Sequence, residues 1–112
     1  MSDVLFVQIQ PQGFKDGLQL LNKRQEIEDK LDNAIKDKQL GEWMAGDVGP
    51  GGGNMLYRVS DINNSLQAIY DELRVNNLEK KVVTGRRISS SKDDWFYEVI
   101  YPTKFSGTFN TM

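Results

Sequence analysis

The segment that most constrains the fold is Gly46 to Gly53, in which five of eight residues are glycine and one is proline. A run of this kind does not continue a helix, because each glycine costs about 1 kcal/mol relative to alanine in a helix interior. The flanking segments Leu40 to Ala45 and Met55 to Ser60 have the apolar and aromatic content of strands. We therefore predict an antiparallel hairpin with residues 46–53 as its loop.

Two amphipathic helices are predicted, one on each side of this hairpin. Lys23 to Lys38 is rich in helix formers, and Ile62 to Arg74 follows Ser60-Asp61, whose short oxygen side chains suit an N-cap. Residues 12–22 contain two glycines among apolar residues, and we interpret them as a buried connection that can include a helical turn. The expected buried stripes are Leu20, Arg24, Ile27, Leu31, Ala34 and Ile35, then Ile62, Leu66, Ile69, Tyr70 and Leu73.

Three further strands complete the predicted order of elements. They are Val4 to Gln10, Lys81 to Ile88 and Trp95 to Tyr101, with residues 89–94 as a polar turn. The order strand, helix, strand, strand, helix, strand, strand predicts an α+β fold of the ferredoxin-like split βαβ type. Two helices would cover a four- or five-stranded antiparallel sheet, with the first and third strands adjacent. We expect a single α+β domain over residues 1–102 and a C-terminal tail over 103–112.

Both faces of the predicted sheet are partly apolar. In the first strand Leu5, Val7 and Ile9 oppose Val4 and Phe6, and the last strand has aromatic residues on both sides. A sheet with one solvated face shows a cleaner alternation, so we expect the second face to be covered. The tail, through Phe105 and Phe109, residues 12–22, and a second copy of the chain in a homodimer are the alternatives.

The composition excludes several classes of protein. The 112 residues contain no Cys and no His, which excludes disulfides, thiolate nucleophiles, imidazole bases and zinc fingers. A pI of about 5.1 disfavours binding of nucleic acid over the whole surface. No apolar run approaches the roughly 20 residues of a membrane span, and no signal peptide is evident, so we expect a cytoplasmic protein. We expect neither an enzyme nor a bound cofactor or metal.

Two features of the central segment could carry chemistry. The glycine run could cradle an anion, but it leads into a strand, whereas phosphate-binding loops lead into a helix. Glu42 and Asp47 flank the run and could form an acid pair, although nothing in the sequence brings them together. We interpret the run as a hairpin loop and the two acids as solvated residues.

A basic segment precedes the last aromatic strand. Its bases are Lys80, Lys81, Arg86, Arg87 and Lys92. Bases beside exposed aromatic side chains are used by proteins that bind single-stranded RNA. The alternative site for an anion or a nucleic acid is therefore Lys80, Lys81, Arg86, Arg87, Trp95 and Tyr97. Lysines on an edge strand also deter aggregation of sheets, which explains the pattern without a ligand.

The stretch Leu40-Gly-Glu-Trp-Met-Ala-Gly-Asp-Val-Gly-Pro-Gly-Gly-Gly-Asn-Met-Leu-Tyr57, followed by Asp61 and the helical stripe at 62–73, resembles a group of small bacterial ferredoxin-like proteins. Most members are uncharacterised, and some are similar to immunity proteins of toxin systems. The resemblance covers about residues 24–75 and implies no catalytic residue.

This resemblance, together with the missing His and Cys, predicts a non-catalytic protein-binding module, such as an immunity-type inhibitor of a bacterial toxin. Acidic side chains on the first helix would then complement a basic toxin surface. The expected partner-binding residues are Glu26, Glu28, Asp29, Asp32, Asp47, Gly49 and Gly51. A protein that binds single-stranded nucleic acid or a small anion through the basic segment is the alternative.

Overall fold

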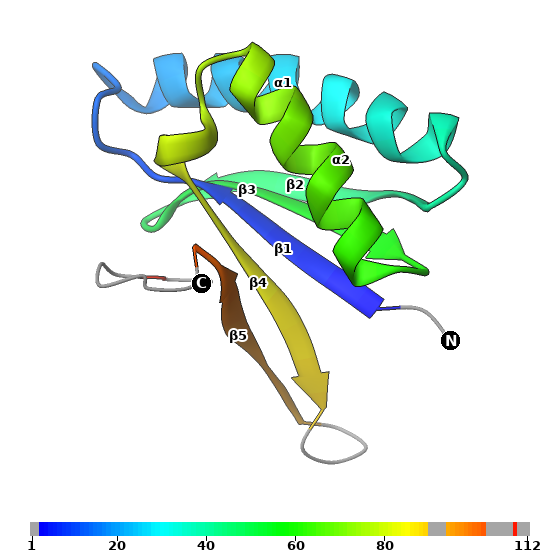
Figure 1. Ribbon diagram of the computed structural model, residues 1–112. Coiled ribbons are helices and arrows are strands. Elements are labelled where there is room, and N and C mark those ends of the chain that lie inside the picture. Colours follow the sequence, from blue (N-terminus) through cyan, green and yellow to red (C-terminus); the bar gives the residue numbers. More distant parts are fainter. Residues whose placement is uncertain (1–2, 90–93, 103–108, 110–112) are drawn as a thin grey trace.

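Two helices pack on one face of a five-stranded antiparallel sheet, with the strand order β2-β3-β1-β4-β5 (Figure 1). The computed structural model describes residues 3–89, 94–102 and 109. The elements are β1 (Asp3–Ile9), α1 (Gly17–Asp37), β2 (Gly41–Gly49), β3 (Gly52–Val59), α2 (Ile62–Val75), the 3₁₀ turn η1 (Glu79–Lys81), β4 (Val82–Ser89) and β5 (Trp95–Tyr101). The predicted α+β class, with two helices and an antiparallel sheet, is confirmed.

Strand β1 lies at the centre of the sheet. It pairs with β3 on one side, from Asp3 opposite Val59 to Ile9 opposite Gly53, and with β4 on the other. The expected adjacency of the first and third strands is therefore confirmed. Strands β2 and β5 form the two edges.

The core lies between the sheet and the two helices. Leu5, Val7 and Ile9 alternate along β1 and are fully buried, as their spacing predicts. The predicted helical stripes supply most of the opposite wall. The buried apolar members from the helices are Leu20, Ile27, Leu31, Ile35, Ala68, Ile69, Tyr70 and Leu73. This packing leaves the other face of the sheet, which we call the helix-free face, without a helical layer.

Helix α1 begins earlier than the sequence predicted. Its first residue is Gly17 rather than Lys23, so half of residues 12–22 is helical. The prediction that this segment is a buried connection is wrong, because most of its residues are exposed and only Leu20 is buried. The Asp16 carboxylate accepts a hydrogen bond from the backbone N–H of Gln19 at 2.9 Å, which satisfies one free donor of the first turn. A glycine at the first position costs little there, because the cap fixes the local backbone.

Helix α2 matches its prediction closely. Asp61 is the N-cap and accepts from the backbone N–H of Asn64 at 3.0 Å. The helix ends at Val75 with Asn76 as its C-cap, and Asn77 has a φ of 59° that stops further helical turns.

The predicted loop over residues 46–53 is too long. Strands β2 and β3 continue through most of the glycines, and only Pro50 and Gly51 lie between them. Gly52 has a φ of +138°, and a β-carbon there would overlap the carbonyl oxygen of Ile9. The glycines thus allow close approach of neighbouring strands, a long-range requirement that local composition does not reveal.

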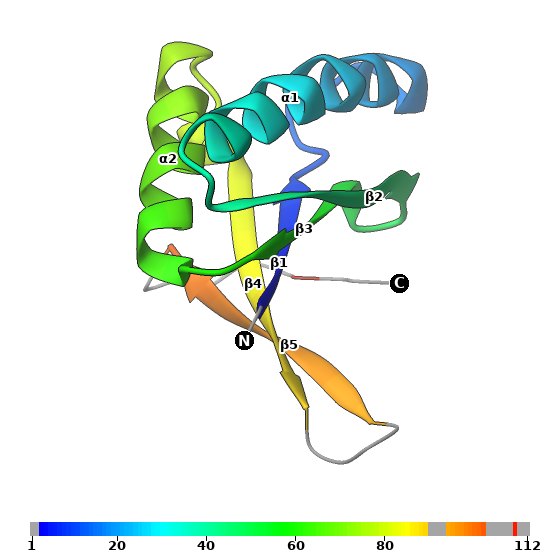
Figure 2. The same cartoon turned by 90° about the vertical axis from the view of Figure 1, so that its right-hand side faces the viewer.

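The hairpin of β4 and β5 extends away from both helices (Figures 1 and 2). Strand β5 spans the predicted residues, and β4 begins one residue later than predicted because η1 includes Lys81. A register shift between Thr84 and Gly85 turns the end of β5 toward the helices, where the Tyr101 ring lies 4.1 Å from that of Tyr70. Residues 90–93 of the predicted turn and most of the predicted tail lie outside the described residues.

No helix in the described part of the chain is long and apolar enough to cross a membrane.

Candidate functional site

The acidic residues predicted to bind a partner lie along α1, but most have cationic partners within the same helix. Glu26 contacts Lys23 and Lys30 at 3.4 and 3.5 Å, and the hydrogen bond from Lys23 is the main reason that the Glu26 pKa is lowered. Arg24 donates to Glu28 in a pair that is largely buried. This helix therefore presents less negative charge than its composition suggests.

The other two acids of the set differ from each other. Asp32 accepts from the backbone N–H of Trp43 at 2.8 Å and pairs with Lys36 at 3.0 Å, which ties α1 to the edge strand β2. Asp29 is exposed, with no ion pair among the described residues. Asp29 is thus the most available acid of the α1 set.

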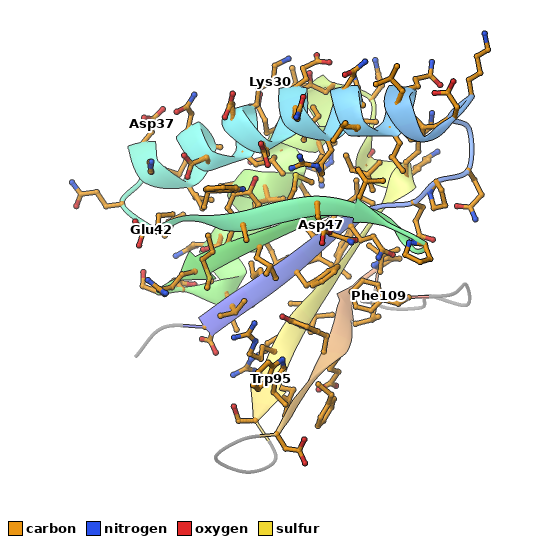
Figure 3. The ribbon with its side chains drawn as sticks, turned by 180° about the vertical axis from the view of Figure 1, so that it is seen from behind. Lys30, Asp37, Glu42, Asp47, Trp95 and Phe109 are labelled. Carbon is orange, nitrogen blue, oxygen red and sulfur yellow. The ribbon has the colours of Figure 1, made fainter. Side chains whose placement is uncertain are left out.

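Asp47, Gly49 and Gly51 lie on the β2–β3 hairpin. Asp47 is opposite Asn54 on the helix-free face, and its carboxylate accepts from the Asn54 side-chain amide at 2.9 Å. Gly49 closes β2, and Gly51 is in the turn. Since α1 covers the opposite face, the structure does not bring Asp47 together with the α1 acids (Figure 3).

The basic segment is also divided. Lys80 and Lys81 belong to η1, and the Lys81 ammonium lies 5.5 Å from the centre of the Phe14 ring. Neighbours on a strand point to opposite faces, so Arg86 and Arg87 are separated. Arg86 pairs with Asp3 at 3.3 Å. Only Arg87 remains with the aromatic strand, while Lys92 lies outside the described residues.

Part of the site predicted for an anion or a nucleic acid does come together, namely Arg87, Trp95 and Tyr97. The Arg87 guanidinium donates to the Tyr97 hydroxyl at 2.7 Å and lies 5.0 and 5.5 Å from the Trp95 and Tyr97 ring centres. Its Nε atom is buried without a hydrogen-bond partner in the described structure. The two rings and the hydroxyl hold this cation in one place.

Arg87 also differs from the other arginines of the chain in its charge environment. The other four, Arg24, Arg58, Arg74 and Arg86, each pair with a carboxylate. Among the described residues, Arg87 has no carboxylate partner within 4.0 Å. A fixed guanidinium without a counter-ion is suited to bind an anionic group.

A cavity of about 290 Å³ adjoins Arg87 on the helix-free face. Aromatic and apolar side chains supply much of its wall, and the charged groups Asp47 and Arg87 come from strands on opposite sides of β1. The lining residues are Phe6, Ala45, Gly46, Asp47, Asn54, Leu56, Arg87, Trp95 and Tyr97. Figure 3 shows Asp47 and Trp95 at well-separated places on this face.

A chain of side-chain amides orients the Asp47 end of the cavity. Gln10 donates to Gln8 at 2.6 Å, Gln8 donates to Asn54 at 3.0 Å, and Asn54 donates to Asp47. Gln8 and Asn54 are buried, at 0% and 5% exposure. Sequence reasoning missed Phe6, Gln8 and Asn54 as site residues. The polar Gln8 within an otherwise apolar strand was the available signal.

Phe109 packs on the same face beside this cavity. Its ring centre lies 5.4 Å from that of Phe6, nearly perpendicular to it, and a β-carbon on Gly85 would lie 2.8 Å from the Phe109 ring. Phe6 contacts Tyr97 as well, with ring centres 4.9 Å apart. One residue of the predicted tail therefore covers part of the second face. Phe105 lies outside the described residues.

Glu42 and Asp47 share the helix-free face but do not form a pair. Five residues of extended strand separate them by roughly 16 Å, beyond the roughly 5–9.5 Å between the two acids of a glycosidase. Glu42 instead contacts Arg58 at 3.4 Å. Within the described ranges, no three carboxylates gather where they could hold a metal ion.

A comparison with protein-family models, curated proteins and solved structures found no match to this chain.

Proposed function

We propose that this protein is a non-catalytic protein-binding module that docks its partner on the projecting end of the β4–β5 hairpin. The observation that carries this proposal is the exposure of two adjacent aromatic residues on β5. Trp95 is 55% and Phe96 52% exposed, and they point to opposite faces of an edge strand. Large apolar side chains left in water on both sides of one strand favour a surface that a partner covers.

The surroundings of the two rings support a protein partner. Protein interfaces concentrate their binding energy in Trp, Tyr and Arg residues, and Arg87 and Tyr97 adjoin Trp95. The outer edge of β5 pairs with no described strand, so a partner strand could add to the sheet there. Because Arg87 lacks a counter-ion, the partner is expected to offer an acidic group to this end of the hairpin.

In its narrower form the proposal is an immunity-type inhibitor of a bacterial toxin, acting in the cytoplasm. The resemblance of residues 24–75 to the small bacterial proteins supports it. Asp29, the available acid on α1, would then add steering toward a basic toxin surface. The absence of Cys agrees with a reducing compartment.

The proposal includes the ferredoxin-like arrangement for the first four strands and two helices. Two features support it: β3 lies between β1 and β2, and each helix connects strands that are not neighbours. Strand β5 would then be an addition at the β4 edge.

Cover of the helix-free face by a second copy of the chain, in a homodimer, is the alternative to the cover by Phe109 that we propose. The apolar residues of that face support it, whereas the contact of Phe109 with Phe6 supports a cover from within the chain.

The test is capture from the source cell with paired baits. The wild-type chain and the variant Phe96→Ser are immobilised, and Trp43→Ser is the control because Trp43 is also exposed, at 42%, but lies on β2. We expect a protein in stoichiometric amount with the wild type and with Trp43→Ser, and its loss with Phe96→Ser. Equal recovery on all three baits would contradict the hairpin as the docking surface.

A second candidate function is binding of single-stranded nucleic acid, favoured by the position of Arg87 against Trp95 and Tyr97. Affinity for single-stranded RNA should then fall steeply with salt, because each phosphate contact releases counter-ions. Titration with an RNA oligomer at low salt, followed by Trp fluorescence, tests this candidate. An unchanged fluorescence would remove it.

A further inference from the structure

The cavity on the helix-free face combines three features that together specify a ligand. One is an unpaired guanidinium at Arg87, held by Tyr97. Another is a carboxylate at Asp47, oriented through Asn54 by buried amides. The third is an aromatic wall, in which Phe6 on β1 lies between the strands of the two charges and the Tyr97 ring packs 4.9 Å from it, while Trp95 lies beside Arg87 on the outer strand β5.

The two charged groups do not neutralise each other. Neither has an ion pair among the described residues. They lie on strands three spacings apart, which is about 14 Å across a flat sheet, and four register positions apart along the strands, which is about 13 Å. Side chains that reach toward each other over this distance leave a gap of roughly 10 Å. A ligand that meets both must have well-separated polar ends.

Each end selects a different chemical group. An ionised carboxylate only accepts hydrogen bonds, so the Asp47 end requires N–H or O–H donors. The Arg87 end requires an anion, and a guanidinium matches phosphate or carboxylate oxygens in pairs. The Phe6 and Tyr97 rings along the cavity favour a flat ring, because any planar base can stack on an aromatic side chain.

We propose that this cavity binds a free purine nucleoside monophosphate of the guanine type. The guanine ring would stack on the aromatic wall, and its adjacent ring N–H and amino donors would face the Asp47 carboxylate. The phosphate would reach Arg87. A free amino acid does not match this arrangement, because its charged groups are attached to one carbon and cannot span the gap. The cavity volume of about 290 Å³ is close to the lower end of the usual range for small-molecule sites, about 300 Å³.

The amides that orient Asp47 indicate that the cavity selects a base by its hydrogen-bond donors and not by stacking alone. Buried Gln8 and Asn54 occupy positions on β1 and β3 where apolar residues would pack at lower cost. Their hydrogen bonds fix the direction of the Asn54 amide, which in turn fixes one oxygen of Asp47. The other oxygen can receive the ligand.

This inference goes beyond the proposed protein partner and is tested without one. In the variant Trp43→Phe, Trp95 is the single tryptophan, so its fluorescence reports on the cavity. Guanosine monophosphate, guanosine and uridine monophosphate are titrated at low salt. We expect saturable quenching by guanosine monophosphate, with an affinity at least about 10-fold higher than that for either of the other two probes.

Substitutions of Asp47 and Arg87 in the Trp43→Phe background show which ligand group each residue contacts. Asp47→Asn should reduce the preference for guanosine monophosphate over uridine monophosphate by about 10-fold or more, because a carboxylate that accepts two donors becomes an amide. Arg87→Gln should remove the preference for guanosine monophosphate over guanosine, and Arg87→Lys should restore part of it. Thermal unfolding of each variant shows whether the fold is retained, and amide chemical shifts of the wild type locate the ligand independently of any substitution.

The proposal is overturned if guanosine monophosphate causes no saturable quenching, if all three probes bind alike, or if the shifted amides lie away from the cavity. Binding of an RNA oligomer without binding of the mononucleotide would also overturn it, in favour of the second candidate function. Loss of a captured protein partner in Phe96→Ser bears only on the proposed docking surface, because Phe96 does not line the cavity.

Discussion

The substitution Gly46→Ala tests the interpretation that the central glycines make room for α1. Gly46 lies on β2 directly beneath the Arg24–Glu28 pair of α1. A β-carbon at Gly46 would overlap Arg24 Nη1 and would lie 2.9 Å from Glu28 Oε2 and 3.0 Å from the Asn54 carbonyl oxygen. The guanidinium must therefore move.

The cost follows from how firmly Arg24 is held. The Arg24 side chain is 7% exposed, that of Glu28 is 17% exposed, and a β-carbon on Gly53 would lie 3.3 Å from the Arg24 β-carbon. Moving the guanidinium breaks its charged hydrogen bond to Glu28, which is worth about 1.5–3 kcal/mol. A buried carboxylate left with no partner at all would cost about 3–5 kcal/mol. Because the Glu28 carboxylate is partly exposed to water, we expect the free energy of unfolding to fall by about 2–3 kcal/mol.

Urea unfolding followed by circular dichroism measures this loss. Gly17→Ala is the matched control, since nothing lies within 4 Å of its β-carbon position, and it should be neutral or stabilising by up to about 1 kcal/mol. In the background Arg24→Met with Glu28→Leu, Gly46→Ala should cost much less, because the crowded polar atoms are gone. A Gly46→Ala variant within about 0.5 kcal/mol of the wild type would refute the interpretation.

Three further predictions follow from the core and from the helix-free face. Burial raises the pKa of Tyr57 and of Tyr70 above the ordinary value of 10.0. The stability that each tyrosine contributes is therefore complete below pH 10 and declines at higher pH by about 1.4 kcal/mol per pH unit. The urea midpoint should be lower at pH 11 than at pH 9. Tyr70→Phe should lose about 1–2 kcal/mol at pH 7, measured by urea unfolding, because the buried Thr84 hydroxyl loses its partner at 2.9 Å, and it should also flatten the alkaline slope. Sedimentation at micromolar concentration should show a monomer of 12.8 kDa for the full chain, because Phe109 covers Phe6, and self-association after deletion of residues 103–112; a dimer with the tail intact would identify a second copy as the cover.

Elements set by local signals were predictable from the sequence. The aromatic run 95–101 became β5 without change, and Asp61 capped α2 as its position before an apolar stripe indicated. The early start of α1 is not predicted from local composition, because Gly17 disfavours a helix, although Asp16 supplies the cap. Local composition predicts a loop at the glycine run, because glycine is a turn signal, whereas Gly46 and Gly52 are required by the close approach of Arg24 and Ile9.

The candidate site was less predictable because it depends on register. Strand alternation alone could have separated Arg86 from Arg87, since the two are neighbours in sequence. The position of Asp47 opposite Asn54, and of Asn54 opposite Gln8, follows only from how β2, β3 and β1 align. Residues 40 positions apart in the sequence, such as Asp47 and Arg87, share a cavity for the same reason.

The central claim is that the end of the β4–β5 hairpin is a docking surface, and calorimetric titration of the captured partner against paired variants tests it most directly. A ring at the centre of an interface contributes about 2 kcal/mol or more, so Phe96→Ser should weaken binding by roughly 30-fold or more. Trp43→Ser, which removes a comparably exposed ring from β2, should change the affinity by less than about 2-fold. Unchanged affinity in Phe96→Ser, or a larger loss in Trp43→Ser, would contradict the account.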